Sequence, residues 1–138
     1  MEENNTITFY TDGAYSGSKK KGGWALYSPQ YNLRICHGEM NTTNNRMEMM
    51  AVIKALEFVV DSNIPEKHIV IISDSKYVIE TMKGNYQKKT NLDLWDKMDM
   101  LVSALFAKTI TWKHVKGHTG LTAGNDVVDH LANLVSQI

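Results

Sequence analysis

Residues 68–74 read His-Ile-Val-Ile-Ile-Ser-Asp, a nearly continuous apolar run that ends in a carboxylate. A run of this length, rich in β-branched residues, is typical of a strand that is buried on both faces of a sheet. The triplet Asn63-Ile64-Pro65 breaks a helical stretch before the run, and helix-forming residues follow it from Ser75 to Met82. The run therefore predicts an α/β fold with this strand inside the sheet.

The residues on the N-terminal side of this run predict three strands on short connections. β-Branched and aromatic residues mark the first strand at residues 6–12, and similar runs follow at residues 24–28 and 33–40. A Gly- and Lys-rich loop and a turn at Pro29 connect the three strands. Such short connections favour an antiparallel meander.

Four helices and one more strand complete the predicted order βββ-α-β-α-α-β-α. The helices are predicted from the capping residues 42–45 to Val60, at residues 75–82, from Leu92 to about Phe106 with Asn91 as the cap, and at residues 125–135. The last strand is predicted at residues 109–115. The fold class is therefore α/β, with a five-stranded mixed sheet in which helical crossovers add two strands to the meander and helices flank the sheet.

The composition is that of an ordinary globular domain. The chain has 138 residues, of which 43% are hydrophobic and 22% charged, so we expect a single domain over residues 1–138. Its one cysteine, Cys36, excludes an internal disulfide. No apolar run approaches the ~20 residues of a membrane helix, and the acidic, polar N-terminus does not resemble a signal peptide. We therefore expect a cytoplasmic protein.

The charges sum to zero, because 15 Lys and Arg residues balance 15 Asp and Glu residues. This balance excludes a protein that holds nucleic acid or membrane through bulk positive charge. It does not exclude a site in which the two signs are segregated. The positions of the acidic residues therefore carry more information than their sum.

Two aspartates stand at predicted strand ends. Asp12 closes the first strand, and Asp74 closes the apolar run. Functional sites in open α/β sheets form outside the carboxyl ends of strands. Strand-end aspartates are also frequent turn formers, because their carboxylates bond to nearby backbone amides. Taken singly, each aspartate fits both interpretations.

Helical periodicity places Glu48 on the apolar face of its helix. At about 100° per residue, Glu48 lies near Val52 and Val59 and points at the sheet. An isolated buried carboxylate is costly. Glu48 therefore has a salt-bridge partner, a metal ion or a proton, or it lies close enough to the helix end to stay hydrated.

The same reasoning gives the opposite result for Asp129. Its helix is predicted to bury Val127, Leu131 and Leu134. Asp129 then lies on the polar face, together with Asn133 and Ser136. Solvation alone is enough to explain a carboxylate at that position.

Carboxylates that converge at one sheet edge repel one another unless a cation lies between them. Oxygen-only donors favour a hard cation such as Mg²⁺ or Mn²⁺. No cluster with zinc spacing competes, since Cys36 is alone. Two such ions about 3.5–4 Å apart stabilise the attacking and leaving oxygens of a phosphodiester displacement. The pattern indicates metal-dependent phosphoryl transfer or nucleic-acid hydrolysis.

Six short motifs follow one another along the chain. They are Thr11-Asp12-Gly13, Thr42-Thr43-Asn44-Asn45-Arg46-Met47-Glu48, Ser73-Asp74-Ser75, Asp93-Leu94-Trp95, Trp112-Lys113-His114-Val115-Lys116-Gly117-His118 and Asn125-Asp126-Val127-Val128-Asp129. In this order they resemble the motifs of ribonuclease H type 1. The resemblance implies an RNase H-like fold and an endonuclease that hydrolyses the RNA strand of RNA–DNA hybrids, leaving 5′-phosphate and 3′-hydroxyl ends.

The resemblance also implies two Mg²⁺ ions, with Mn²⁺ as a substitute, and a role for each matched residue. Asp12 matches the aspartate that bridges both ions. Glu48 and Asp74 match the ligands that complete the ion on the leaving-group side, and Asp129 matches a ligand of the ion that carries the attacking water. His118 matches a histidine associated with product release or proton traffic, a role that a near-neutral pKa suits.

The partner that the resemblance implies is an RNA–DNA hybrid duplex, bound by a monomer. Asn44 and Asn45 match residues that contact the two strands in the minor groove, where 2′-hydroxyls and backbone are recognised. Thr43 matches part of a pocket for a DNA-strand phosphate, and a helix start suits a phosphate on physical grounds as well. Capping of the helix by Thr43 or Asn44 is compatible with these roles.

The chain departs from the family pattern at three places. Lys76 stands where many members have a glutamine that faces the minor groove, so a phosphate contact is expected there instead. Asn41 stands where some members have an arginine. The segment of residues 83–91 is a short form of a basic insertion that holds the hybrid in some members. We expect weaker, more salt-sensitive binding than in members with the full insertion.

Three alternatives stay open at this point. Another nuclease of the same superfamily, such as a resolvase or an exonuclease, is disfavoured by residues 42–45. A catalytically inactive hybrid-binding module should lack metal ligands, but all four matched acids are present. Asp93, Asp96 and Asp99 form either an extra cation site or, at their helical spacing, a solvated acidic face.

Overall fold

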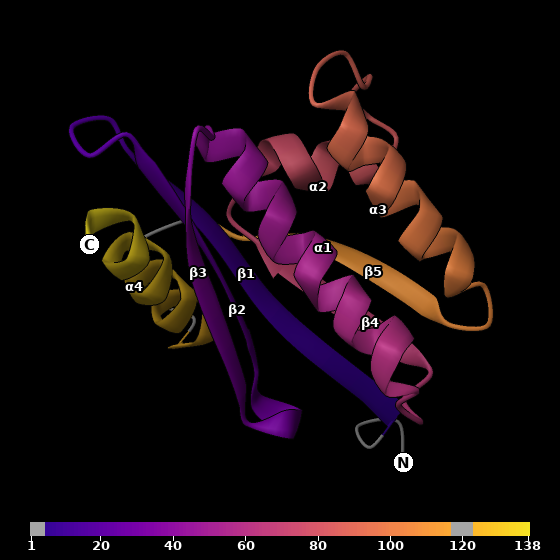
Figure 1. The fold of residues 1–138 in the computed structure, drawn as a ribbon. Coiled ribbons are helices and arrows are strands. Elements are labelled where there is room, and N and C mark those ends of the chain that lie inside the picture. Colours follow the sequence, from indigo (N-terminus) through magenta and orange to yellow (C-terminus); the bar gives the residue numbers. More distant parts are fainter. Residues whose placement is uncertain (1–4, 117–122) are drawn as a thin grey trace.

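The secondary structure follows the order that the sequence predicts (Figure 1). The computed structural model describes residues 5–116 and 123–138. The strands in this part are β1 (Thr6–Ser16), β2 (Lys21–Ser28), β3 (Leu33–Met40), β4 (His68–Ser73) and β5 (Thr109–His114). The helices are α1 (Asn44–Ser62), α2 (Lys76–Met82), α3 (Leu92–Ala104) and α4 (Ala123–Gln137), and a short 3₁₀ helix, η2 (Pro29–Tyr31), precedes β3.

The strands form a mixed sheet in the order β3-β2-β1-β4-β5. β1, β2 and β3 pair in antiparallel fashion, which is the predicted meander. β4 lies parallel between β1 and β5, and helices connect it to both neighbours in the chain. The apolar run of residues 68–73 thus lies inside the sheet, and the predicted α/β class with two crossover strands is confirmed.

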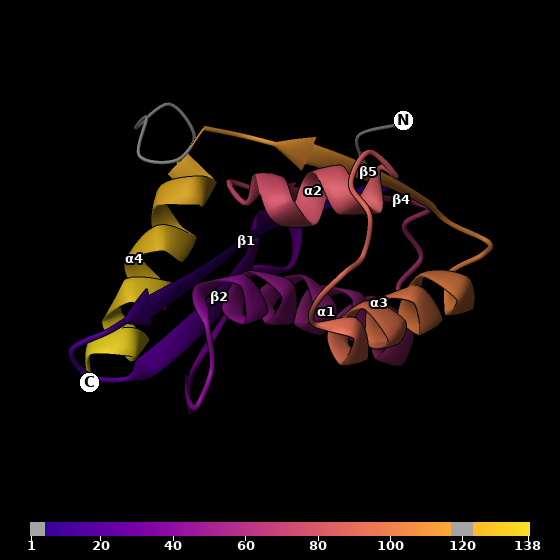
Figure 2. The ribbon, with the colours of Figure 1, turned by 90° about the horizontal axis from the view of Figure 1, so that it is seen from above.

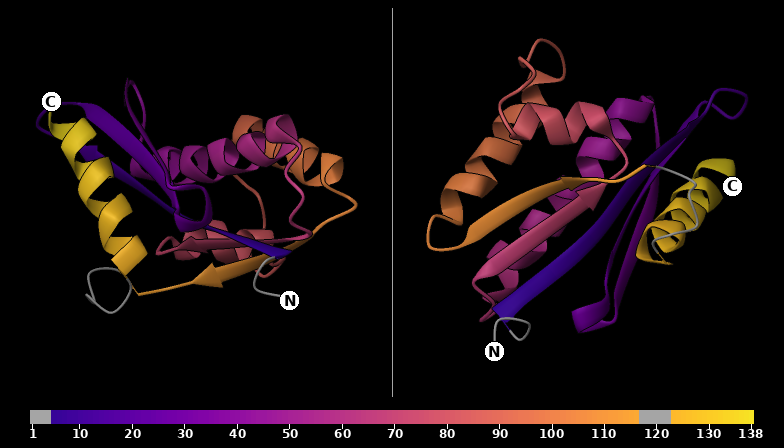
Figure 3. Two further views of the ribbon diagram at one scale, coloured as in Figure 1. Left: turned by 90° about the horizontal axis from the view of Figure 1, so that it is seen from below. Right: turned by 180° about the vertical axis from the view of Figure 1, so that it is seen from behind.

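Helices cover both faces of this sheet, as the edge-on view of Figure 2 and the two views of Figure 3 show. α1, α2 and α3 lie on one face, and α4 lies on the other. The core beneath the first three helices contains large side chains, among them Phe9, Leu56, Ile71 and Trp95. Burial of these side chains fixes α1 against the middle of β1.

The packing beneath α4 uses small side chains. This second core consists of Ala14, Ala25, Val128 and Ala132. A Cβ added to Gly23 on β2 would lie 2.5 Å from the carbonyl oxygen of Ala132, so only a glycine fits between the strand and the helix there. α4 therefore approaches the sheet closely, at the end of β1 that carries Asp12 and Ala14.

The face that α4 buries differs from the predicted one. Leu134, expected to be buried, is 47% exposed, whereas Val128 and Ala132 are buried. Ser136, expected on the polar face, is buried as well, and its hydroxyl donates a hydrogen bond to the Asn133 carbonyl oxygen. The close approach to the sheet selects this row of small side chains, which lies about 100° around the helix from the predicted row. Asp129 is consequently half-buried beside the packed row, instead of on the opposite face of the helix.

β1 runs to Ser16 instead of ending at Asp12, because Gly13 does not break the strand. Gly13 lies within the strand and pairs with Trp24. A Cβ on Gly13 would lie 2.3 Å from the backbone nitrogen of Glu48. Glycine is thus needed here for the close approach of α1 to β1, and not for a turn.

Asn91 precedes α3 as predicted, but its side chain does not cap the helix. Its backbone is in the left-handed region, with φ 57°. The side-chain oxygen accepts a hydrogen bond of 3.2 Å from Arg46 Nη1 on α1, and the side-chain nitrogen donates one of 3.1 Å to the Tyr77 hydroxyl on α2. Asn91 therefore connects three helices.

Most other predicted ends shift by one or two residues. α1 ends at Ser62, α3 at Ala104 and β5 at His114, and α4 spans Ala123–Gln137. Differences of this size are usual at frayed ends. Within residues 5–116 and 123–138, no helix combines the length and the apolar character needed to cross a membrane.

Candidate active site

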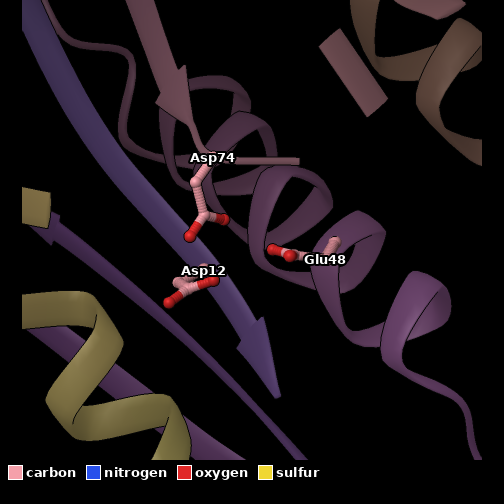
Figure 4. A group of neighbouring side chains, drawn as sticks. All are labelled: Asp12, Glu48 and Asp74. Carbon is pink, nitrogen blue, oxygen red and sulfur yellow. The ribbon is translucent and has the colours of Figure 1, made fainter. Parts of the chain in front are cut away.

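Three acidic side chains from three separate elements point toward one another (Figure 4). Asp12 lies in β1, Glu48 near the start of α1, and Asp74 directly after β4. Each offers an oxygen atom, and these atoms all lie within 4.8 Å of one another. The parallel pairing of β1 and β4 aligns Thr11 with Ser73, which brings the following residues, Asp12 and Asp74, side by side.

The backbone amide of Gly13 connects two of these carboxylates. It donates a hydrogen bond of 2.8 Å to Asp12 Oδ1 and one of 2.7 Å to Glu48 Oε1. The absence of a side chain on Gly13 lets the start of α1 come within reach of this amide. β1 thereby holds both carboxylates at one point of the sheet.

Glu48 lies on the buried face of α1, as the helical periodicity predicts. It is 6% exposed, and Val52 and Val59 on the same face are buried. Among the described residues, no Lys, Arg or His forms an ion pair with Glu48, so the salt-bridge alternative is not found there. Its acidic neighbours are Asp12 and Asp74.

Burial and mutual repulsion raise the pKa values of this site. Burial, and next the charge of Asp74, raise the pKa of Asp12 from 3.8 to about 8. Burial also raises the pKa of Glu48, followed in size by the charges of Asp12 and Asp74. A cation among the three would favour their ionised forms. Because all the donors are oxygens, the site fits a hard divalent cation.

These acids line a cleft of about 280 Å³ at the edge of the sheet. Its lining consists of Asp12, Gly13, Ala14, Tyr15, Asn44, Glu48, Asp74, Asp129 and Asn133. The cleft therefore brings together residues of β1, α1 and α4 with the residue that follows β4. A polar lining of this kind suits a charged ligand rather than an apolar one.

Asp129 reaches the cleft from α4. It is not part of the group of three whose oxygens lie within 4.8 Å of one another, but it lines the same space. The half-buried position beside the packed row of α4 explains this placement, which amphipathicity alone did not predict. A polar helix face can thus border a cleft as well as bulk solvent.

Asn133 is a cleft residue that the sequence did not single out. Its side-chain nitrogen donates to the Asp129 carbonyl oxygen at 2.8 Å and to Asp129 Oδ1 at 3.3 Å. The available signal was its position four residues after Asp129 on the predicted polar face. Asn133 therefore orients the Asp129 carboxylate.

The predicted substrate-binding residues lie around the start of α1 and α2. Asn44 lines the cleft, whereas Thr43, Asn45 and Lys76 are exposed and do not line it. The Thr43 hydroxyl accepts a hydrogen bond of 3.2 Å from the Arg46 amide and so caps α1. Lys76 is the first residue of α2, two positions after Asp74.

Two further sequence predictions have different outcomes. His118 lies outside the described residues. Asp93, Asp96 and Asp99 are exposed on α3, where Asp93 pairs with Arg46 at 2.8 Å and Asp99 pairs with Lys88 at 2.6 Å. These aspartates thus form a solvated acidic face, and the extra cation site is not found.

Comparison with known proteins places this site in context. The chain matches the family described as RNase H over residues 4–137. A ribonuclease H of Ruthia magnifica subsp. Calyptogena magnifica is 38% identical over an alignment of 145 positions, which covers 94% of each chain. A ribonuclease HI of Rickettsia prowazekii is 39% identical over an alignment of 141 positions, which covers 91% of this chain and 88% of the relative.

A solved structure supports the fold independently. The N-terminal RNase H domain of a Mycobacterium tuberculosis protein, fused to maltose-binding protein, superposes with a TM-score of 0.79 at 22% identity. The match covers 96% of this chain and 94% of that one. At this identity the likeness concerns the arrangement of the elements.

Proposed function

The chain belongs to the RNase H family, and from this premise we propose which of its residues carry out the reaction. Members of this family are metal-dependent nucleases that hydrolyse the RNA strand of RNA–DNA hybrids, and this chain is an endonuclease of that kind. The observation that carries the residue assignment is the convergence of Asp12, Glu48 and Asp74 within 4.8 Å. Together with Asp129 in the same cleft, they are the proposed catalytic residues.

We propose Mg²⁺ as the metal, with two ions in the site and Mn²⁺ as a substitute. Support comes from the all-oxygen donor set and from the repulsion that raises the pKa of Asp12 and Glu48. When bound, the ions activate a water molecule and stabilise the charge on the attacking and leaving oxygens of the phosphodiester.

Each carboxylate has a separate part in this proposal. Asp12 would contact both ions, since it has Glu48 and Asp74 as close neighbours and shares the cleft with Asp129. Glu48 and Asp74 would hold the ion on the leaving-group side, and Asp129 would hold the ion on the water side. The products would carry 5′-phosphate and 3′-hydroxyl ends.

The remaining polar residues of this edge are assigned to the substrate. Asn44, which lines the cleft, and Asn45 next to it would contact the two strands in the minor groove. Thr43 and the backbone amides at the start of α1 would bind a DNA-strand phosphate. Lys76 would contact a phosphate from the start of α2. His118 would move a proton, since an imidazole titrates near neutral pH.

We further propose that the chain acts as one domain, as a monomer and in the cytoplasm. One chain supplies all four acids of the cleft, so the proposed reaction needs no residue from a second copy. The cytoplasm is supported by Cys36, the single cysteine of the sequence. Size-exclusion chromatography with light scattering tests the monomer, which a dimer at micromolar concentration would contradict.

A cleavage assay on matched substrates tests the function. The purified protein is incubated with an RNA–DNA hybrid, single-stranded RNA, double-stranded RNA and double-stranded DNA of one sequence, with Mg²⁺ or with a chelator. We expect internal cuts in the RNA of the hybrid only, and only with the metal. Cleavage of double-stranded DNA or of a DNA junction would favour the resolvase alternative instead.

A further inference from the structure

The hairpin between β1 and β2 carries positive charge that the proposed active site does not use. Ser16 pairs with Lys21, so residues 17–20 form the loop. Lys19 and Lys20 lie at its end, and both are exposed. The sequence has no acidic residue between Asp12 and Glu39 that could neutralise them locally.

Neither of these two lysines has an ion-pair partner among residues 5–116 and 123–138. In the described part of the chain, the cations of the ion pairs are Arg46, Lys54, Lys83, Lys88 and Lys97. Two of these, Lys83 and Lys88, belong to the short basic segment of residues 83–91 and are paired with Glu80 and Asp99. The hairpin therefore offers positive charge that is available to a ligand, while that segment is partly neutralised.

Lys21, the third lysine of the run, is in a different environment. A Cβ on Gly38 would lie 2.6 Å from Lys21 Cε and 2.9 Å from the Val135 carbonyl oxygen. The Lys21 side chain thus lies across β3 beside the last turn of α4. Lys21 is half-buried, so it does not belong to the exposed pair at the end of the loop.

The hairpin follows directly after the part of β1 that lines the cleft. The lining follows β1 from Asp12 to Tyr15, and the loop begins after Ser16. At about 3.3 Å per residue, the loop starts about 13 Å from Asp12. Figures 1 and 2 show the hairpin tip, the start of α1 and the segment between α2 and α3 along one edge of the molecule. The hairpin lies at one end of that edge, residues 83–91 lie at the other end, and the start of α1 lies between them.

We propose that Lys19 and Lys20 bind backbone phosphates of the hybrid on one side of the scissile bond. The proposal rests on the proposed function, which places the scissile bond at Asp12. The phosphates of one strand repeat about every 3.4 Å along the axis of a duplex, so a hairpin that extends along this axis contacts phosphates about four to six base pairs from the cut. Lysine suits this task, since a flexible point charge follows phosphates without regard to sequence.

The test compares K19A/K20A with K67A. Lys67 is exposed and precedes β4, at the end of the strand away from Asp74, so its replacement removes charge at a distance. Hybrid binding is measured by titration of a labelled, uncut duplex with each variant in a D12N background. We expect the slope of log Kd against log salt to fall by about two for the hairpin variant. When the salt concentration rises from about 50 to about 200 mM, the Kd of the hairpin variant should then increase by a factor about tenfold smaller than the Kd of the protein with both lysines. K67A should leave the slope unchanged.

A second measurement locates the contact. Hybrids that extend about three or about twelve base pairs beyond the cleavage position, on either side, are compared with both proteins. The hairpin variant should weaken binding only when the long arm is on one particular side. An unchanged Kd and slope for K19A/K20A, or an equal effect of K67A, would overturn the proposal. If binding depends on the hairpin but the protein with an intact Asp12 cuts no hybrid in Mg²⁺, the proposed function alone is refuted.

Discussion

The backbone amide of Gly13 donates a hydrogen bond of 2.7 Å to Glu48 Oε1, so the middle of β1 holds a carboxylate from the start of α1. The same amide bonds to Asp12 Oδ1 at 2.8 Å. A strand and a helix that are far apart in the sequence thus share one donor at the centre of the acidic cleft. The glycine at this position is as much a part of the site as the acids are.

Gly13→Ala is expected to damage both stability and activity. Its Cβ would lie 2.3 Å from the Glu48 nitrogen and 2.4 Å from the Met47 carbonyl carbon, which are backbone atoms. α1 must then shift, at a cost of about 1–3 kcal/mol, and Glu48 moves away from Asp12. Thermal unfolding and cleavage kinetics measure the two effects. Gly17→Ala is the control, since nothing lies within 4 Å of its Cβ. Equal Tm and kcat for both variants would contradict the role of Gly13.

Asp12→Asn is expected to stabilise the metal-free protein. Burial and the charge of Asp74 raise the pKa of Asp12 to about 8, so at neutral pH the folded chain holds a proton that the unfolded chain releases. Asparagine carries no such cost, and it cannot ionise and repel the other acids. The gain should be at least about 1 kcal/mol at neutral pH, because one pKa unit corresponds to about 1.4 kcal/mol. Denaturant unfolding in a chelator measures it. Addition of Mg²⁺ should stabilise the wild type more than the variant. A variant that is less stable than wild type without metal would show that the acids do not repel.

The stability of the metal-free protein should fall as the pH rises. Burial first, and then the charge of Asp74, raise the pKa of Asp12 from 3.8 to about 8. The folded chain therefore holds a proton that the unfolded chain releases, so this contribution is complete below about pH 4 and lost through about pH 8. Unfolding in a chelator at a series of pH values measures the slope. The slope should be smaller for Asp12→Asn and with Mg²⁺ present, and identical slopes would exclude this origin.

The ion pair of Arg46 with Asp93 should stabilise the protein at neutral pH and fail in acid. Hydrogen bonds from the Arg46 guanidinium lower the pKa of Asp93 from 3.8 to about 2. The contribution is present above about pH 4 and lost as the pH falls to about 2. Asp93→Asn should therefore lower Tm at pH 7 but not at pH 2. Asp96→Asn, on the exposed face of the same helix, is the control. A Tm difference that is constant with pH would contradict this account.

Local sequence patterns were sufficient for the inner position of the strand at residues 68–73 and for the direction of Glu48. The apolar run of residues 68–73 has to be covered on both faces, and that requirement by itself selects an inner strand. Glu48 shares the period of Val52 and Val59, so its direction follows from helix geometry alone. Both predictions depend on one element and its nearest neighbours.

The errors arose where the outcome depends on a contact between distant segments. Gly13 looks like a strand end, until the backbone of α1 is placed 2.3 Å from its missing Cβ. The buried row of α4 is set by Gly23 and the small residues of β1 and β2, and no pattern within α4 reveals them. Asn91 resembles a cap, but Arg46 and Tyr77 engage its side chain.

The central claim is that Asp12, Asp74, Glu48 and Asp129 form one metal-dependent catalytic site. Its most direct test is the single-turnover rate of hybrid cleavage in Mg²⁺ for Asp12→Asn and Asp74→Asn, with Asp96→Asn as a control of equal chemistry outside the cleft. The account predicts that the first two variants fold, as judged by circular dichroism, and lose cleavage by several orders of magnitude. Asp96→Asn should cleave at the wild-type rate. Wild-type turnover by Asp12→Asn would contradict the account.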